Sequence, residues 1–279
     1  YWKRFRVKVK NILVAPDRGN HVIYMDKNEW AASEKKIYAR VCKDLTTFKT
    51  YHRIIRDAQT RFIQATRELT RGNLGKLSAA SLMARFKKWD NAHLQFVIRP
   101  IWIPFPVEPI LSEKTTRALE AYIKKRGEGE LFQHALEIIF SPENKNAIMR
   151  ENEELLKLGC ALQRNTLEKS AIHALLFKHW QEWQWIPCYD FADDPWKIEV
   201  FEKRLEELLL QPRNAMEQQL RDNRRRFPKN KRAFARLLET VRSPKRTREL
   251  MIMAHTIAHI KDERDDYRRL GTFLSFPLY

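Results

Sequence analysis

The residue types best suited to chemistry gather in one stretch, which runs from His179 to Trp196 and reads HWQEWQWIPCYDFADDPW. It holds four of the chain's eight tryptophans, one histidine, one cysteine and three aspartates. Because each buried aromatic ring covers roughly 150–250 Å², so many rings beside a loop predict either the wall of a ligand pocket or an ordinary core between helices.

A cationic segment, RRRFPKNKR, occupies residues 224–232. It lies in a region, residues 221–249, whose twelve lysines and arginines and three acids give a net charge of +9, half of the chain's +18. Such a field attracts polyanions, including the phosphates of nucleic acids. The segment matches no recognition module, so a basic loop between helices on a cationic protein explains it equally well. The candidate nucleic-acid contacts are Arg224, Arg225, Arg226, Lys229 and Lys231.

Nine residues near the C-terminal end, KDERDDYRR at 261–269, carry eight charges. Charge runs are usually solvated helix faces or helix ends with local ion pairs, each contributing about 0.3–0.5 kcal/mol. A docking surface for a moving domain or a phosphate is the functional alternative.

Just before this run, His255, His259 and Glu263 lie four residues apart, a spacing that puts them on one helix face and is compatible with a divalent metal. No fourth ligand is obvious, and pairs at this spacing are usually solvent-side contacts between neighbouring turns. We therefore expect no metal site.

The motifs that the sequence does not contain are informative as well. There is no GxxxxGK[ST], GxGxxG, GxSxG or HExxH. With seven glycines in 279 residues, no loop can cradle a triphosphate by its backbone N–H groups in the usual way. A self-sufficient nucleotide-using enzyme is not expected, and no catalytic residue or bound cofactor is assigned to this chain.

Composition indicates a mainly α fold. Glycine is scarce, Leu, Ala, Glu, Lys and Arg abound, and 43% of the residues are apolar, enough for a real core. We expect a multi-helix bundle of two lobes with a small N-terminal β-hairpin. The expected order is the hairpin at 1–26, an N-terminal helical lobe at 27–98, a proline-rich connector at 99–111 and a C-terminal helical domain at 112–279.

Local patterns place several elements. Alternating basic and apolar residues at 4–9 and a β-prone run at 21–25 predict the two strands of the hairpin. Apolar residues at steps of three and four predict an amphipathic helix over 45–69 that ends near Gly72. Because its apolar stripe includes polar side chains, we expect this stripe to be only partly buried. These polar members are His52, Gln59 and Thr66.

Proline marks a boundary and several helix starts. Four prolines within residues 100–109 predict an extended, buried connector, since proline lacks the N–H that a helix needs. Proline is tolerated at the first helical position, where no N–H partner is required. Three further helices are therefore expected to start at the caps Ser141-Pro142, Asp194-Pro195 and Ser243-Pro244.

Three widely spaced cysteines, without a CxxC pair, fit a reduced, cytoplasmic protein. No apolar run reaches the length of a membrane span and no signal peptide is visible, so we expect no membrane partner. The chain begins at Tyr1 without a methionine and stops just after an apolar run, which we interpret as a piece of a longer protein.

Three motifs occur in an order that resembles the central helical region of phosphoenolpyruvate synthase, pyruvate phosphate dikinase and rifampicin phosphotransferase. The first is Ser141-Pro142 followed by two glutamates and two leucines, with Asn144-Lys145-Asn146 where that region usually has a serine. The second is H-x₃-W-x-W-I-P at residues 179–187, with tryptophan replacing a tyrosine. The third is I-K-D-E-R at residues 260–264. The acidic and leucine positions of the first motif are Glu151, Glu153, Leu155 and Leu156.

The resemblance covers about residues 75–270 and implies a division of labour. In such proteins an ATP-grasp domain precedes this region and a mobile domain with a phosphorylatable histidine follows it. The chain would then bind a small-molecule acceptor or act as a scaffold, and we expect it to be inactive in isolation. ATP and Mg²⁺ are expected only in the other domains, and no histidine here is assigned as the phosphocarrier.

The same resemblance gives the charge run a role. Lys261, Asp262 and Arg264 would lie where the mobile domain docks, because cations at such a surface can meet phosphorylated groups. The candidate substrate-binding residues follow from the same resemblance: Trp183, Trp185 and Trp196 would line or support an apolar acceptor groove, with His179 as a polar anchor. A basic nucleic-acid-binding module and a purely structural scaffold are the alternatives.

Overall fold

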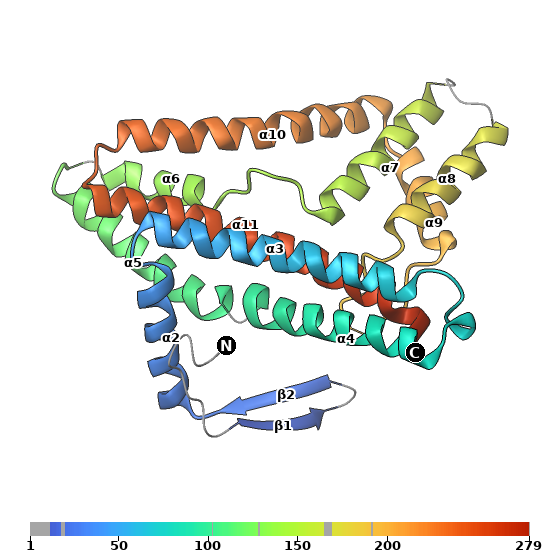
Figure 1. Cartoon of the computed structure of the whole chain (residues 1–279). Coiled ribbons are helices and arrows are strands. Elements are labelled where there is room, and N and C mark those ends of the chain that lie inside the picture. Colours follow the sequence, from blue (N-terminus) through green and yellow to red (C-terminus); the bar gives the residue numbers. More distant parts are fainter. Residues whose placement is uncertain are drawn as a thin grey trace. The chain divides into compact units, whose positions relative to one another are not determined.

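The computed structural model describes residues 12–17, 20–101, 103–127, 129–164, 169–190 and 192–278. The described chain is mainly α-helical, as the composition predicts. At its start β1 (Ile12–Asp17) pairs antiparallel with β2 (Asn20–Met25), with Ile12 opposite Met25 (Figure 1). The expected second strand coincides with β2, whereas the expected first strand, at residues 4–9, lies outside the described residues.

The chain divides into two compact units, each made of two separate segments. Unit 1 comprises Tyr1–Ser141 and Arg236–Arg264, and unit 2 comprises Pro142–Ala235 and Asp265–Tyr279. Two long helices, α10 (Arg213–Thr240) and α11 (Lys245–Ser275), contribute to both units. The division therefore differs from the expected one, which placed the boundary at residues 99–111.

Unit 1 is built from paired helices whose starts follow the sequence signals. Asp26 and Ser78 are N-caps, and their side-chain oxygens accept from backbone N–H groups of the first turn. In this unit α3 packs along α4, and α2 packs along α5 (Figure 1). Its helices are α2 (Lys27–Val41), α3 (Leu45–Thr70), α4 (Ala79–Phe96), α5 (Pro104–Lys124) and α6 (Gly129–Phe140), with a 3₁₀ turn, η1 (Leu74–Lys76).

The polar residues on the apolar stripe of α3 are more deeply buried than expected. Gln59 and Thr66 are fully buried, while His52 is half-buried. Thr66 is accommodated because its hydroxyl donates to the carbonyl of Phe62 at 2.8 Å and accepts from the indole Nε1 of Trp89 at 3.1 Å. The helix itself spans nearly the predicted residues.

The extended proline-rich connector is not observed, and that expectation is corrected. Residues Val97–Ile101 form a π-helical turn, η2, and Pro104 already starts α5. Pro104 and Pro106 fall within the first turn, where N–H groups have no partner inside the helix, so their missing donors cost little. Pro109 is the one proline inside the body of α5, where it removes a single backbone hydrogen bond.

Unit 2 places three shorter helices against one another: α9 packs on both α7 and α8. Its apolar core combines Leu155 of α7, Leu176 of α8 and Phe201 of α9 with tryptophans of the aromatic stretch. Gly159 allows a close approach, since a Cβ there would lie 3.2 Å from the sulfur of Met216. The helices are α7 (Ala147–Gln163), α8 (Lys169–Trp183) and α9 (Ile198–Leu209).

Two of the expected proline caps are wrong. The helix expected at Ser141-Pro142 starts at Ala147, because Asn146 is the residue whose side chain accepts from the N–H of Met149. Likewise α9 starts at Ile198, three residues after Pro195. The third expected start is close to the observed one, since α11 begins directly after Ser243-Pro244.

The basic segment is helical rather than a loop. Residues 224–232 lie within α10, and Pro228 is accommodated inside that helix. In the described chain no helix is both long enough and apolar enough to span a lipid bilayer. The C-terminal end closes with a 3₁₀ turn, η3 (Phe276–Leu278).

Candidate functional site

A buried ionic network in unit 2 is centred on Glu151 of α7. Its side chain is fully buried, and its two oxygens accept from the guanidinium of Arg204 on α9 at 2.9 and 2.8 Å. Nε2 of His179 on α8 lies 3.0 Å from one of the same oxygens. Because a buried carboxylate is tolerated only when its oxygens are paired, this one side chain ties three helices together.

His179 lies between two carboxylates and an aromatic ring. Its Nδ1 is 3.9 Å from an oxygen of Glu154, and its ring meets Phe201 edge-on, with centroids 5.2 Å apart. The same Glu154 oxygen accepts from the indole Nε1 of Trp183 at 2.7 Å. His179 is thus an anchor within the core, with 8% of its surface exposed.

Trp183 and Trp185 belong to the core of unit 2, since they are 5% and 8% exposed. The indole N–H of Trp185 donates to the carbonyl of Glu182 at 2.7 Å, so the polar atom of each ring has a partner. The two rings therefore pack inside unit 2, and their burial favours the core interpretation over a direct contact with a ligand.

Trp196 differs from the other three expected substrate-binding residues because it is half-buried. Its backbone is held on both sides: its N–H donates to the carbonyl of Gln184 at 2.9 Å, and its carbonyl accepts from the indole of Trp180 at 2.8 Å. The Arg204 guanidinium lies 5.4 Å from its ring centre, and the Arg204 side chain is 28% exposed. Arg204 thus joins the Trp196 ring to the Glu151 carboxylate through a cation–π contact and a two-point ion pair.

Sequence reasoning missed Arg204 and Glu154. Arg204 lies in EKRLEELL, where its neighbours Lys203 and Glu202 look equally suited to solvent. Only the position of α9 against α7 turns its side chain toward Glu151, 53 residues earlier in the chain. No spacing rule carries that information.

Glu153, the second glutamate of the first motif, pairs with two lysines. Lys145 and Lys157 both donate to its carboxylate, which is largely buried. Burial alone would raise the pKa of this carboxyl, but the two ammonium groups outweigh it and hold the pKa below its usual value. Glu153 is therefore a structural anion near the start of α7.

The charge run at residues 261–269 is not a helix end, because α11 continues to Ser275. Lys261 lies 3.5 Å from Glu108 of α5, an ion pair with another helix rather than a local one. Asp262 and Arg264 are half-buried. The expected docking residues thus share one helix turn, and the structure gives Lys261 a partner in unit 1.

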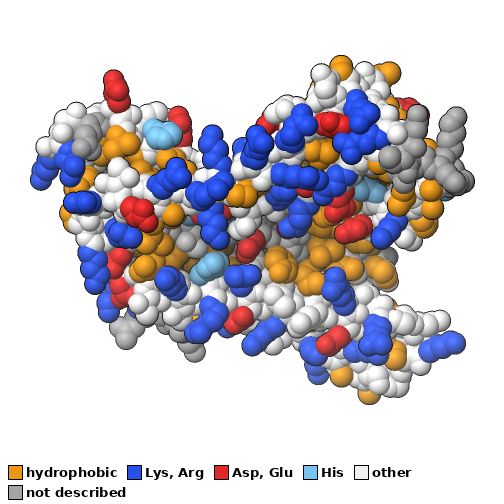
Figure 2. Space-filling model, turned by 90° about the horizontal axis from the view of Figure 1, so that it is seen from above, with side chains coloured by type: hydrophobic (Ala, Val, Ile, Leu, Met, Phe, Trp, Pro, Cys, Tyr) orange, Lys and Arg blue, Asp and Glu red, His pale blue; other side chains and the backbone are white. Residues whose placement is uncertain are grey.

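The five expected nucleic-acid contacts are all exposed on α10. The helix also brings Arg221 and Arg232 into line with Arg225 and Lys229 at steps of four, four and three, so these four cations share one face. Arg232 bends its guanidinium toward the carbonyl of Pro228 at 3.2 Å. Figure 2 shows that lysine and arginine side chains are more common than acidic ones over the face it presents.

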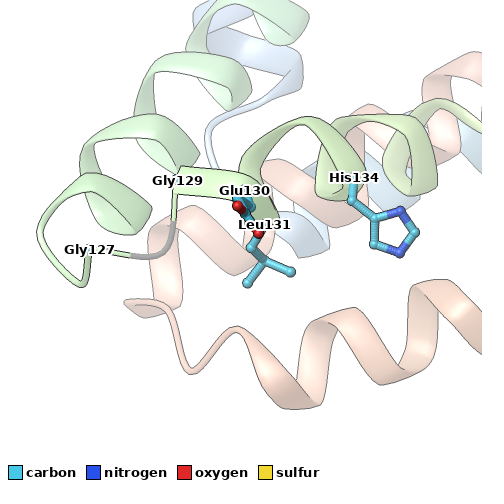
Figure 3. A pocket seen from close by; sticks show the side chains of 5 residues that line it. All are labelled: Gly127, Gly129, Glu130, Leu131 and His134. Carbon is cyan, nitrogen blue, oxygen red and sulfur yellow. The ribbon is translucent and has the colours of Figure 1, made fainter.

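A hollow of about 570 Å³ opens in unit 1 where α6 begins. Glu130, Leu131 and His134 line it from the first turns of α6, together with Gly127 and Gly129 (Figure 3). His134 lies 3.9 Å from Glu137 on its own helix and is largely exposed. Among the described residues its lining offers two titratable side chains, Glu130 and His134, both from α6.

The thiols are poorly suited to covalent catalysis. Cys42, Cys160 and Cys188 are buried and form no disulfide. Burial raises the pKa of Cys42 and of Cys188 to about 12, so the thiolate that a nucleophile requires is scarce at neutral pH.

Comparison with known proteins gives no match: no family model fits the chain, and no curated protein or solved structure is significantly similar. The role of the Glu151 network must therefore be inferred from its own geometry.

Proposed function

We propose that this chain is the helical scaffold of a multidomain phosphotransferase related to phosphoenolpyruvate synthase, pyruvate phosphate dikinase and rifampicin phosphotransferase. In this proposal it positions a small-molecule acceptor and does not transfer the phosphoryl group itself. ATP-grasp and mobile histidine domains are its partners, and ATP and Mg²⁺ bind to them. The proposal also places the protein in the cytoplasm.

One observation supports it above all. The first and second motifs of the resemblance meet in the buried network, where Glu151 of one pairs with His179 of the other at 3.0 Å. Leu155 and Trp183, from the same two motifs, belong to one apolar cluster. Residues of two separate motifs that pack on one another are what we expect of a helical scaffold. Such residues specify how the helices fold together, whereas a ligand site depends on further side chains.

Within this proposal, Trp196 and Arg204 are the acceptor contacts, while His179, Trp183 and Trp185 support them. Lys261, Asp262 and Arg264 form the docking site of the mobile domain. The half-buried ring of Trp196 provides an aromatic surface for a planar group, and the partly exposed Arg204 side chain lies beside it.

The decisive experiment uses the native protein from source cells. An antibody raised against this chain is used to isolate the native polypeptide, which is incubated with Mg²⁺ and ATP labelled at the β- and γ-phosphates. We expect acid-labile phosphohistidine on a polypeptide several times heavier than 33.5 kDa, at a histidine outside residues 1–279. A native species of 33.5 kDa that takes up no label would contradict the proposal.

A nucleic-acid-binding module is the second candidate, favoured by the exposed cationic face of α10. The test is fluorescence anisotropy with a single-stranded RNA over a range of salt concentrations. Arg225→Gln, Lys229→Gln and Arg232→Gln in one variant should weaken binding more than tenfold and reduce its salt dependence. The control variant removes three exposed cations from α2, namely Lys27, Lys35 and Lys36. If the α10 and α2 variants weaken RNA binding equally, α10 is not a specific binding surface.

A further inference from the structure

Two histidines of unit 1 lie one turn apart on α11 with their ring nitrogens facing each other. Nε2 of His255 is 3.4 Å from Nε2 of His259, and their ring planes cross at 87°. His255 is 5% exposed and His259 is half-buried. The expectation that these residues make solvent-side contacts is therefore wrong for His255.

The tautomer of neutral His255 follows from its other hydrogen bond. Its Nδ1 lies 2.7 Å from the carbonyl oxygen of Ile139. Because a carbonyl oxygen can only accept, Nδ1 carries the proton and Nε2 carries the lone pair. Ile139 lies in the last turn of α6, where carbonyls have no partner within their own helix. A backbone carbonyl that orients an imidazole through its second nitrogen is the usual support of a metal-binding histidine.

We propose that His255 and His259 bind a divalent transition-metal ion, Zn²⁺ or Cu²⁺, through their Nε2 atoms. An ion at the usual Zn–N distance of about 2.0–2.1 Å from both nitrogens would subtend an angle of roughly 110°, close to the tetrahedral value. The i, i+4 spacing on a helix is the one that places two histidines on a single zinc ion in known metal motifs. Water or a carboxylate completes the coordination.

The third residue of the sequence pattern does not take part. An oxygen of Glu263 lies 3.9 Å from Nε of Arg56 on α3, so its carboxylate is paired with a cation. The ligand pair is thus two imidazoles, which suit Zn²⁺ and Cu²⁺, whereas Mg²⁺ requires oxygen ligands in an octahedral arrangement. This site is separate from the Mg²⁺–ATP chemistry of the proposed phosphotransferase, and neither proposal depends on the other.

A simple hydrogen bond between the two rings is the competing explanation, although 3.4 Å is long for an N–H···N contact. The two explanations differ in one measurable respect. A hydrogen-bonded pair gains nothing from added Zn²⁺, whereas a metal site binds one equivalent and is stabilised by it.

The test is isothermal titration calorimetry of the metal-free full chain with ZnCl₂, with MgCl₂ as the negative control. We expect one equivalent of Zn²⁺ to bind the unmodified chain, and His259→Gln to weaken it at least 100-fold. The exposed His134→Gln on α6 should leave binding unchanged. Failure of the unmodified chain to bind Zn²⁺, or equal affinity in folded His259→Gln, would overturn the proposal.

A second measurement needs no variant. Electron paramagnetic resonance of the unmodified chain with one equivalent of Cu²⁺ should show hyperfine coupling to two imidazole nitrogens. Coupling to fewer than two would overturn the site, whatever the folding behaviour of the variants. His255→Gln should remove one of the two couplings if that variant folds.

Discussion

At the scale of single residues, burial decides which polar side chains matter. Glu151 and Gln59 are both fully buried, but their surroundings differ. The carboxylate of Glu151 is paired with Arg204 and His179, whereas neither amide atom of Gln59 has a hydrogen-bond partner among the described residues. The first should therefore stabilise its unit, and the second should cost free energy.

Glu151→Gln should lower the free energy of unfolding by about 2–4 kcal/mol, because it leaves the Arg204 guanidinium beside a neutral amide. Partial exposure of Arg204 keeps the loss toward the lower end. Urea denaturation followed by tryptophan fluorescence measures it. Glu154→Gln, at a side chain that is 42% exposed, is the matched control and should cost less than 1 kcal/mol. Equal losses in the two variants would mean that the buried Glu151–Arg204 pair contributes no more to stability than the exposed Glu154 side chain.

Gln59→Met should raise the free energy of unfolding by about 1–2 kcal/mol, since it removes an unpaired buried amide and keeps the volume. Gln64→Met on the exposed face of the same helix is the control, with a change within about 0.5 kcal/mol. Thermal unfolding by circular dichroism compares the two. A loss of stability in Gln59→Met would show that the Gln59 amide is hydrogen-bonded, either to bound water or to a residue outside the described ones.

At the scale of elements, the start of α7 depends on one local acceptor and on one that is distant in sequence. The N-terminal turn of α7 is held by its own cap, Asn146, and by Asp266 of α11. Asp266 accepts from the N–H of Ala147 at 2.8 Å and lies 3.2 Å from a guanidinium nitrogen of Arg150. A carboxylate at this end also interacts favourably with the helix dipole.

Asp266→Ala should therefore lower the free energy of unfolding by about 1 kcal/mol. Asp266→Asn keeps an acceptor but not the charge, so its loss should be smaller. Chemical denaturation of the three proteins under identical conditions provides the comparison. A variant pair with equal losses would assign the whole effect to charge, and an unchanged Asp266→Ala would show that Asn146 suffices.

At the scale of the whole molecule, two histidines of unit 1 link stability to pH. Burial lowers the pKa of His52, helped by the nearby Arg56, and burial also lowers the pKa of His93, which Asp90 partly offsets. His93 stacks between Trp89 and Phe62, with ring centroids 5.1 and 5.4 Å away. Such a packed position favours the neutral imidazole.

Because the folded pKa values lie below the ordinary value of about 6.5, the unfolded chain takes up protons first as pH falls. These two histidines should leave the free energy of unfolding unchanged between about pH 7 and 8 and should decrease it below about pH 6.5. Urea midpoints at pH 7.5 and 5.5 test this. His93→Phe should reduce the difference, while the exposed His173→Gln should leave it unchanged, and a higher midpoint at pH 5.5 would contradict the sign.

The sequence by itself determined the helical class and the long α3 helix, because these depend on composition and on periodicity along the chain. It placed the aromatic stretch and Glu151 in one pattern without showing that they touch. Only the tertiary structure decided that Asp266 of α11 holds the first turn of α7 and that Arg204 pairs with Glu151. Those outcomes depend on contacts between residues far apart in the chain, where no local pattern constrains them.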